Sequence, residues 1–250
     1  MRCGRVVATL ETPGRPAIEP QFQSENEPMR RVIIGAFVSL DGVMQAPGGP
    51  QEDPTGGFSY GGWVAPLVDE VFGEEIDKLF SQPFDLLLGR KTYEIFAAHW
   101  PYAEGGTDDF IATTFNSITK YVATRKGLDL TWKGSVALQD AAQDVAKLKQ
   151  KDGPALITQG STDLIRTLLM NELVDEIRLF TFPIVLGKGK KLFSDAAKAA
   201  AFKLTASRVS PNGIVIAQYV RDGAVKTGNF AMDPPQPAEL ARREKMQREG

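Results

Sequence analysis

The feature that most restricts the fold is an uninterrupted apolar run from Val32 to Val38, which Ser39 and Asp41-Gly42 bring to an end. A strand with one solvated face alternates apolar and polar residues, so a run without alternation indicates a strand that is buried on both faces. Strands of this kind lie in sheets that helices cover on both sides. The run therefore predicts the central strand of an α/β sheet.

After this run, segments with strand and helix patterns alternate along the chain. We predict further strands at 84–88, 120–124, 155–158 and 174–185, and helices at 64–80, 90–98, 108–117, 140–150 and 161–171. The last two strands, 202–210 and 214–220, flank Asn212-Gly213, and Asn-Gly is the strongest short signal for a β-hairpin. This order predicts an α/β fold with a mostly parallel central sheet, helices on both faces and an antiparallel C-terminal edge hairpin.

Composition divides the chain into one folded body and two tails. Residues 1–28 hold several prolines and no sustained periodicity, which is typical of a disordered leader. Met29 directly precedes the first strand and is an alternative start to Met1. The segment 232–250 begins with a proline-rich break and is mostly charged, so it is predicted to be disordered or a frayed helix. The residues between, 29–231, have the size of a single domain.

Cysteine and histidine are nearly absent, because Cys3 and His99 are the only ones in the chain. A disulfide needs two cysteines, and a structural zinc site needs about four Cys or His ligands. The zinc-dependent base deaminases need a Pro-Cys-x-x-Cys motif, which the sequence lacks. We therefore expect no disulfide and no metal.

Charge and hydropathy exclude further classes. The chain has 29 Lys and Arg against 31 Asp and Glu, so its net charge of −2 gives no general attraction to nucleic acid. The longest apolar run is far below the roughly 18 residues that cross a bilayer. The N-terminal residues lack the apolar core of a signal peptide. We expect a cytoplasmic protein with no membrane or nucleic-acid partner.

Three predicted strand ends carry residues that suit an anionic ligand. Gly89-Arg90-Lys91-Thr92 and Gln159-Gly160-Ser161-Thr162 each join a strand to a helix, and Thr124-Arg125-Lys126 follows a third strand. In α/β sheets ligands bind at the carboxyl ends of strands, and helix N-termini with nearby cations bind phosphate. Any one of these segments also fits a tight turn before a helix. Together they indicate one extended polyphosphate ligand.

The segment 45–62 holds six glycines and three prolines in 18 residues, which is typical of a functional loop. Within it, Gly57-Phe58-Ser59-Tyr60-Gly61 matches the G-x-S-x-G pattern of α/β-hydrolase nucleophiles. That pattern needs a strand directly before the serine, whereas Asp53-Pro54-Thr55-Gly56 precedes it here. The one histidine, His99, also comes before most of the sheet. We therefore reject the hydrolase interpretation.

A set of motifs in a fixed order connects these segments. They are Ser39-Leu40-Asp41-Gly42, Leu88-Gly89-Arg90-Lys91-Thr92-Tyr93-Glu94, Lys120-Tyr121-Val122-Ala123-Thr124, Gly160-Ser161, Leu173-Val174-Asp175-Glu176 and Pro183-Ile184-Val185-Leu186-Gly187-Lys188-Gly189-Lys190-Lys191-Leu192-Phe193. By these motifs the chain from Arg31 to about Val220 resembles the dihydrofolate reductase-like superfamily, in the branch of the riboflavin-biosynthesis reductase domain and its stand-alone relatives. The resemblance implies a reductase of a small-molecule substrate that binds NADPH along the strand ends, and a homodimer.

The resemblance also implies where parts of NADPH would bind. The residues that match are Ala36 and Gly42 near the nicotinamide, Gly89, Arg90, Lys91 and Thr92 around the diphosphate and ribose, Thr124, Arg125 and Lys126 at the adenosine 2′-phosphate, and Gln159, Gly160, Ser161 and Thr162 on the phosphate side. Arg125 would thereby select NADPH over NADH, because a guanidinium pairs with the 2′-phosphate that NADH lacks.

No single acid is marked as the proton donor. Asp69 lies nearest the glycine-rich loop among the acids of the helix predicted at 64–80, and we choose it first. Asp41, beside the expected nicotinamide, is the second candidate. A solvated helix face and a turn are the alternative roles of these two residues.

The sequence leaves the substrate open. The alternatives are the ribosylamino-pyrimidinedione phosphate of riboflavin synthesis and dihydrofolate or another pterin. Lys188, Lys190 and Lys191 fit either a substrate phosphate or a solvated surface. A protein of the same fold that binds NADPH without turnover is a further alternative.

Overall fold

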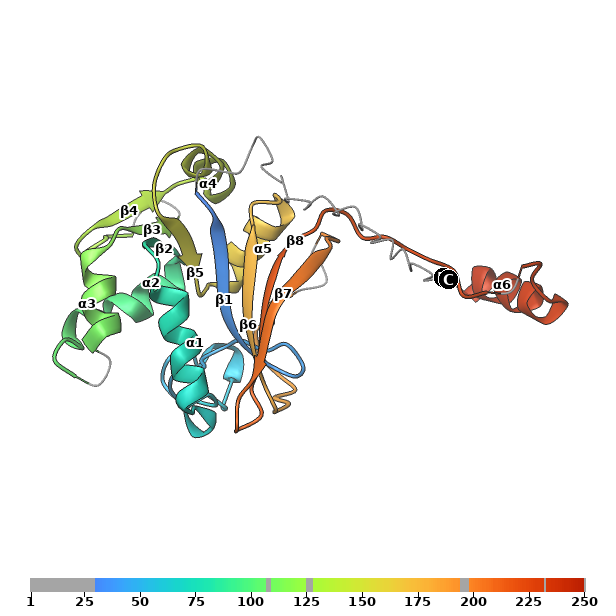
Figure 1. Cartoon of the computed structure of the whole chain (residues 1–250), viewed down its shortest axis with the longest axis horizontal. Helices are drawn as coiled ribbons and strands as arrows, with labels where there is room; N and C mark the ends of the chain where they lie inside the picture. The colour runs from blue at the N-terminus through green and yellow to red at the C-terminus, as the bar shows by residue number, and fades with distance from the viewer. Residues whose placement is uncertain (1–29, 107–108, 125–127, 194–197, 232, 250) are drawn as a thin grey trace, which may run out of the picture.

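Figure 1 shows the computed structural model, which describes residues 30–106, 109–124, 128–193, 198–231 and 233–249. The strands form one eight-stranded sheet in the order β4-β3-β2-β5-β1-β6-β8-β7. They are β1 (Val32–Ser39), β2 (Phe84–Gly89), β3 (Lys120–Ala123), β4 (Ser135–Leu138), β5 (Ala155–Thr158), β6 (Glu176–Phe182), β7 (Phe202–Val209) and β8 (Val215–Arg221). The α-helices are α1 (Glu70–Phe80), α2 (Arg90–Ala97), α3 (Asp109–Ser117), α4 (Ala141–Lys149), α5 (Thr162–Met170) and α6 (Pro237–Glu249).

The sheet is parallel from β4 to β6, and β8 and β7 add an antiparallel pair at one edge. β1 lies between β5 and β6, and every residue of it except Phe37 is buried. This confirms the predicted central strand. The α/β class, the mostly parallel sheet and the antiparallel C-terminal hairpin are confirmed as well.

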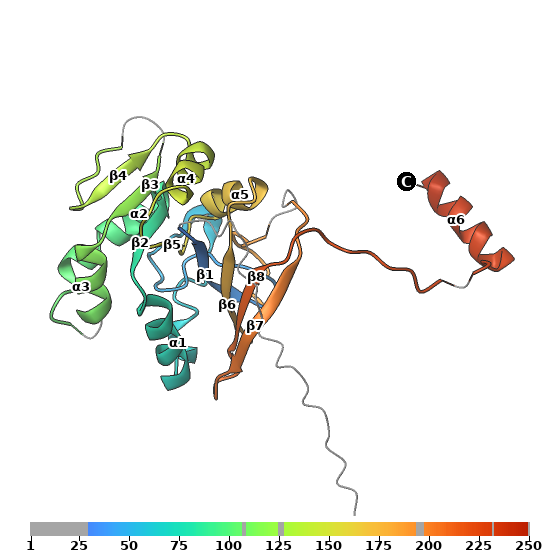
Figure 2. The same ribbon diagram turned by 45° about the horizontal axis from the view of Figure 1, so that its top comes forward.

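Helices cover both faces of the sheet, as Figures 1 and 2 show. α1, α2 and α3 pack on one face, where Leu86 and Leu88 of β2 join their apolar cluster. α4 and α5 pack on the other face, where Leu87 joins a second cluster. Successive side chains of a strand point to opposite faces, so the unbroken apolar run of β2 supplies both cores.

The helix predicted at 64–80 begins later than expected. A single 3-10 turn, Ala65–Leu67, comes first, Val68 is extended, and α1 starts at Glu70. The Asp69 carboxylate accepts a hydrogen bond of 2.9 Å from the Phe72 N–H and so caps the helix. Asp is among the preferred N-cap residues because it satisfies a backbone donor that the helix leaves free.

Two strand predictions also need correction. β6 ends at Phe182 and does not continue to 185, because Pro183 has no N–H to donate to a ladder. β4 was not predicted at all. It is a four-residue edge strand whose central residues Val136 and Ala137 are exposed, so it lacks the apolar signal of a buried strand.

The two tails differ in what the structure describes. The predicted leader 1–28, with Met29, lies outside the described residues. The charged C-terminal segment contains α6, which has no buried residue and lies apart from the sheet in Figure 1. Among the described residues, no helix has both the length and the apolar composition needed to cross a membrane.

Candidate functional site

A large cavity opens at the carboxyl ends of the parallel strands. Its volume is about 1560 Å³, and its lining comes from β1, from the glycine-rich loop after it, from α1, α2 and α3, and from the turns that follow β2, β3, β4 and β5. Sites for one small molecule usually have about 300–1,000 Å³. The cavity therefore has room for two ligands, such as a dinucleotide and a substrate.

Two glycines bring the ends of β2 and β5 into direct contact at the cavity. The Gly89 N–H donates to the Gly160 carbonyl at 3.1 Å. A Cβ at Gly89 would lie 2.2 Å from Ser161 Oγ, and a Cβ at Gly160 would lie 2.7 Å from Thr92 Oγ1. Gly160 also has a φ of 148°, which disfavours any other residue. Only glycine lets these two turns pack together and expose their backbone to a ligand.

In the part of the chain that the structure describes, no side chain caps the N-termini of the two helices that start at these turns. Gly89 offers α2 no capping side chain, and Ser161 makes no side-chain capping bond to α5. By contrast α4, whose first turn also lines the cavity, is capped by its own carboxylates: Asp140 accepts from the Gln143 N–H, and Asp144 from the Gln139 N–H. Anions bind where several backbone donors are free and the helix dipole is positive. A diphosphate is therefore expected at α2 and α5.

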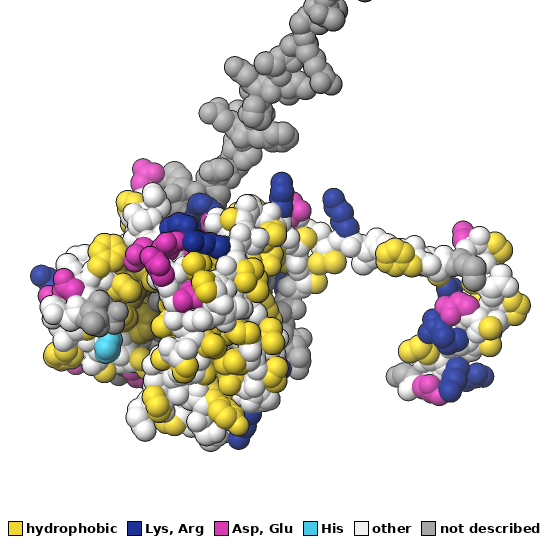
Figure 3. Space-filling view, turned by 60° about the horizontal axis from the view of Figure 1, so that its bottom comes forward, with side chains coloured by type: hydrophobic (Ala, Val, Ile, Leu, Met, Phe, Trp, Pro, Cys, Tyr) yellow, Lys and Arg dark blue, Asp and Glu magenta, His cyan; other side chains and the backbone are white. Residues whose placement is uncertain are grey.

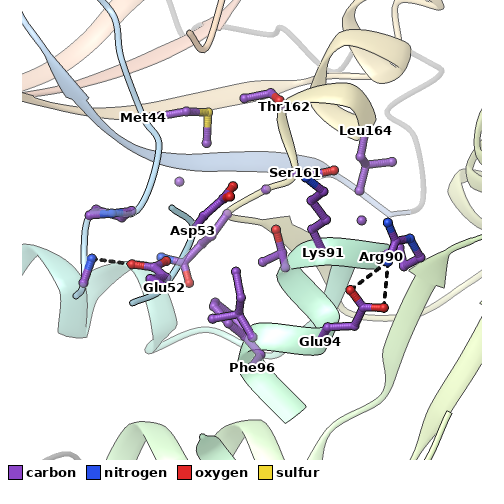
Figure 4. A pocket seen from close by; sticks show the side chains of 18 of the residues that line it. Met44, Glu52, Asp53, Arg90, Lys91, Glu94, Phe96, Ser161, Thr162 and Leu164 are labelled. Carbon is purple, nitrogen blue, oxygen red and sulfur yellow. Dashed lines mark hydrogen bonds and ion pairs between the residues drawn. The ribbon is translucent and has the colours of Figure 1, made fainter. Parts of the chain in front are cut away.

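Cations lie beside this cradle. Figure 4 shows Arg90 and Lys91 on one side of the cavity, with Arg90 bound to Glu94 by both carboxylate oxygens at 2.8 Å. Among the described residues Lys91 has no ion-pair or hydrogen-bond partner. Its ammonium group is therefore free for a phosphate.

The structure brings together most of the cofactor-binding residues that the sequence predicts. Those that line the cavity are Gly89, Arg90, Lys91, Thr92, Thr124, Gln159, Gly160, Ser161 and Thr162. Two others do not line it. Ala36 points to the opposite face of the sheet, into the α4 and α5 cluster, while its neighbours Gly35 and Phe37 face the cavity. Gly42 forms the turn after β1, where its N–H donates to the Ser39 carbonyl. Arg125 and Lys126 lie outside the described residues.

Neither predicted proton donor lines the cavity. The Asp41 carboxylate accepts hydrogen bonds from Ser39 Oγ at 2.6 Å and from the Leu186 and Gly187 N–H groups at 3.0 and 2.8 Å, and these bonds lower its pKa to about 2. At Asp69, partial burial is outweighed by the N–H groups of Phe72 and Asn212, which hold its pKa below the usual value. Both groups hold loops in place, and we withdraw them as proton donors.

Among the acids that line the cavity, Glu52 lies in the glycine-rich loop. Its Oε2 accepts from the Gly48 N–H at 2.6 Å and from the Gly49 N–H at 3.2 Å. Burial raises the pKa of Glu52 above its usual value, and the negative charge of Asp53 raises it further. The two hydrogen bonds from Gly48 and Gly49 lower this pKa, but burial has the larger effect. Asp53 itself is partly buried, but hydrogen bonds from Lys190 and Thr55 keep its pKa below the usual value. The Glu52 carboxyl therefore keeps its proton to a higher pH than an ordinary glutamate, whereas the neighbouring Asp53 carboxyl loses its proton more readily than an ordinary aspartate.

Gln45 fixes the loop that carries Glu52. The buried Gln45 amide donates to the carbonyls of Asp53 and Thr55, each at 2.9 Å, and accepts from the Lys190 N–H at 3.0 Å. The Gln45 carbonyl accepts from Trp63 Nε1 at 2.9 Å. The sequence analysis missed Glu52 and Gln45, because it looked for a proton donor on the following helix and at Asp41. The available signal was the acidic pair Glu52-Asp53 inside a glycine-rich loop.

Apolar side chains line the cavity below Glu52. Phe37 and Phe72 form one wall, with ring centroids 5.4 Å apart. Phe96, Trp100 and Phe115 form the other, with Phe96 stacked on Phe115 at 5.9 Å. Figure 3 shows apolar side chains gathered in a hollow on this face of the molecule. We call this part of the cavity the apolar chamber.

The chain has a dihydrofolate reductase-like fold. It is similar to dihydrofolate reductase from Enterococcus faecalis, solved in complex with NADP(H) and RAB-propyl, with a TM-score of 0.51 at 14% identity over 77% of this chain and 96% of that one. It is similar as well to a putative riboflavin biosynthesis protein from Shewanella sp. PV-4, with a TM-score of 0.54 at 20% identity over 77% and 99% of the two chains.

Within this class, the chain belongs to the RibD C-terminal domain family, whose pattern matches residues 30–216. A relative is the uncharacterized protein YyaP of Bacillus subtilis (strain 168). It is 28% identical over 205 residues, which cover 80% of this chain and 100% of YyaP. The matched region contains all the described residues that line the cavity.

Proposed function

We propose that the chain is an NADPH-dependent reductase of a small heterocyclic substrate. The observation that carries this proposal is the cradle between β2 and β5, where Gly89 and Gly160 expose two uncapped helix N-termini to a cavity with room for two ligands. Membership of the RibD C-terminal domain family and the dihydrofolate reductase-like fold support a reductase-type reaction.

The diphosphate of NADPH would be held by the first-turn N–H groups of α2 and α5, by the Lys91 ammonium group and by the hydroxyl of Thr92. The bound cofactor would supply a hydride, and the chain would orient the substrate and provide a proton. Contact of Arg125 and Lys126 with the 2′-phosphate stays a prediction from the sequence. So does the homodimer.

Tryptophan fluorescence tests cofactor binding directly, because Trp100 lines the cavity. We expect NADPH to quench the emission in a saturable way. A lack of saturation up to about a millimolar, which corresponds to roughly 4 kcal/mol of binding, would end the proposal. Saturable binding together with no oxidation of NADPH by any imine, pyrimidine or pteridine would instead favour a binding protein without turnover.

Lys91→Ala is expected to weaken NADPH binding roughly tenfold or more, since a charge-assisted hydrogen bond contributes about 1.5–3 kcal/mol. Lys203→Ala, which removes an exposed lysine of β7 far from the cavity lining, is the matched control and should leave the dissociation constant unchanged. Fluorescence titration measures both. Equal effects of the two variants would contradict the placement of the diphosphate.

A further inference from the structure

The substrate half of the cavity contains few polar groups. Its walls are the rings of Phe37, Phe72, Phe96 and Trp100, which are partly exposed, and the buried side chains of Phe115, Phe80 and Ile76 pack behind them. The partly exposed rings offer faces and edges on which a flat ring can stack. A ligand of this chamber must therefore present a largely apolar, flat body.

The charges around the chamber are mostly negative. Glu52 and Asp53 lie on one side of the cavity in Figure 4, across from Lys91 and Arg90. The cation on their side is Lys190, and its ammonium group already binds the Asp53 carboxylate and Thr55 Oγ1, the latter at 2.9 Å. Among the described residues, this half thus has no cation free for a phosphate. A phosphate group, with a charge of about −1.5 to −2 at pH 7, would lie unpaired beside carboxylates.

Glu52 is the polar group best placed to contact a ring in the chamber. The hydrogen bonds from Gly48 and Gly49 both end on Oε2, and no described residue binds Oε1. Asp53 and Lys190 lie beside Glu52, and His99 lies at the chamber wall, where its ring centroid is 4.8 Å from that of Trp100. The other titratable groups that line the cavity are Arg90, Lys91, Glu94, Asp140 and Asp163. Of the two carboxyl groups in this half, Asp53 is paired with Lys190, whereas Glu52 forms no ion pair with any residue that the structure describes.

From these contacts we infer that the substrate is a flat nitrogen heterocycle without a phosphate group, and that the Glu52 carboxyl donates a proton to its ring nitrogen. This inference rests on the proposed function, and it specifies that the bond to be reduced is a C=N bond of the substrate. It excludes the phosphate ester of riboflavin synthesis as the preferred substrate.

When bound, the cofactor would supply the hydride for a new C–H bond at the imine carbon. As the C=N π electrons move to nitrogen, the Glu52 O–H bond would break and its proton would form the N–H bond. The imine gains two electrons and is reduced to an amine, the nicotinamide is oxidised, and Glu52 regains a proton from solvent. The acid is active when protonated, so activity falls as the pH rises through the pKa of Glu52, which burial and Asp53 raise.

The first experiment identifies the substrate class. After NADPH binding has been established by fluorescence, its oxidation is followed with 3,4-dihydroisoquinoline, a flat cyclic imine, and with the ribosylamino-pyrimidinedione phosphate. We expect kcat/KM for the imine to exceed that for the phosphate at least a hundredfold. The reverse order would overturn the inference and leave the proposed function intact, whereas a failure to bind NADPH would remove the proposed function itself.

The second experiment isolates the proton. Glu52→Gln should lower kcat for 3,4-dihydroisoquinoline about a hundredfold or more, in the range of general acid catalysis, and abolish the fall in activity at high pH. With 2-methyl-3,4-dihydroisoquinolinium, an iminium that needs no proton, the same variant should lose less than about tenfold. Glu70→Gln, an exposed acid at the start of α1, is the matched control and should match the wild type. Equal losses on both probes would show that Glu52 only supports the loop, and would overturn its assignment.

Discussion

Gly89→Ala is expected to remove measurable NADPH binding and to lower the free energy of unfolding by about 2–3 kcal/mol. The added Cβ would lie 2.2 Å from Ser161 Oγ and 2.9 Å from the Ser161 backbone nitrogen. The hydroxyl can rotate away, but the backbone nitrogen cannot, so the turn before α5 must shift. Overpacking of this kind typically costs about 1–3 kcal/mol. The shift also moves the N–H groups that would bind the diphosphate.

Gly73→Ala is the matched control for this substitution. Gly73 lies inside α1, and a Cβ there would meet nothing within 4 Å. Alanine favours a helix over glycine, so this variant should gain up to about 1 kcal/mol and bind NADPH as the wild type does. Urea unfolding measures stability and fluorescence titration measures binding. If Gly89→Ala binds NADPH within about threefold of the wild type, the contact between the two turns is not part of the site.

The sequence predicted the parts of this protein that local physical chemistry decides. The unbroken apolar run of β1 required burial on both faces, and Asn212-Gly213 required a hairpin. Gly89 and Gly160 were found because a strand, a glycine and a helix follow one another there. In each case the residues that determine the local structure lie within about ten positions of one another in the sequence.

The parts that the sequence did not predict depend on contacts between distant segments. Glu52 reaches the cavity because Gln45 binds the carbonyls around it and Lys190, far along the chain, binds Asp53. Ala36 was predicted to lie near the nicotinamide, but Gly35 and Phe37 face the cavity instead. Alternation along β1 separates Ala36 from its two neighbours, and only the pairing of β1 with β5 and β6 fixes which of them face the cavity. Asp69 was predicted as the first candidate proton donor, but the β7–β8 turn supplies the Asn212 N–H that holds its carboxylate.

Asp85→Ala is expected to destabilise the protein by about 3–5 kcal/mol, which is a large part of the roughly 5–15 kcal/mol that a domain has. Asp85 of β2 forms an ion pair with Arg30, and the two side chains are 11% and 4% exposed. The guanidinium also donates to the Pro154 carbonyl at 2.7 Å and lies 5.4 Å from the ring centre of Tyr121. Removal of the carboxylate would leave this buried charge without an anion.

Two further variants separate the loss of the ion pair from the loss of packing. Arg30→Met combined with Asp85→Leu replaces both charges by apolar groups and should recover most of the stability, because a buried pair contributes little beyond the penalty of breaking it. Glu74→Ala removes the exposed partner of Arg208, whose side chain is 40% exposed, and should cost less than about 1 kcal/mol. Urea unfolding of the wild type and of the three variants measures each difference in the free energy of unfolding. If the double variant is as unstable as Asp85→Ala alone, the pair itself stabilises the fold, and the cost does not come from an unpaired Arg30.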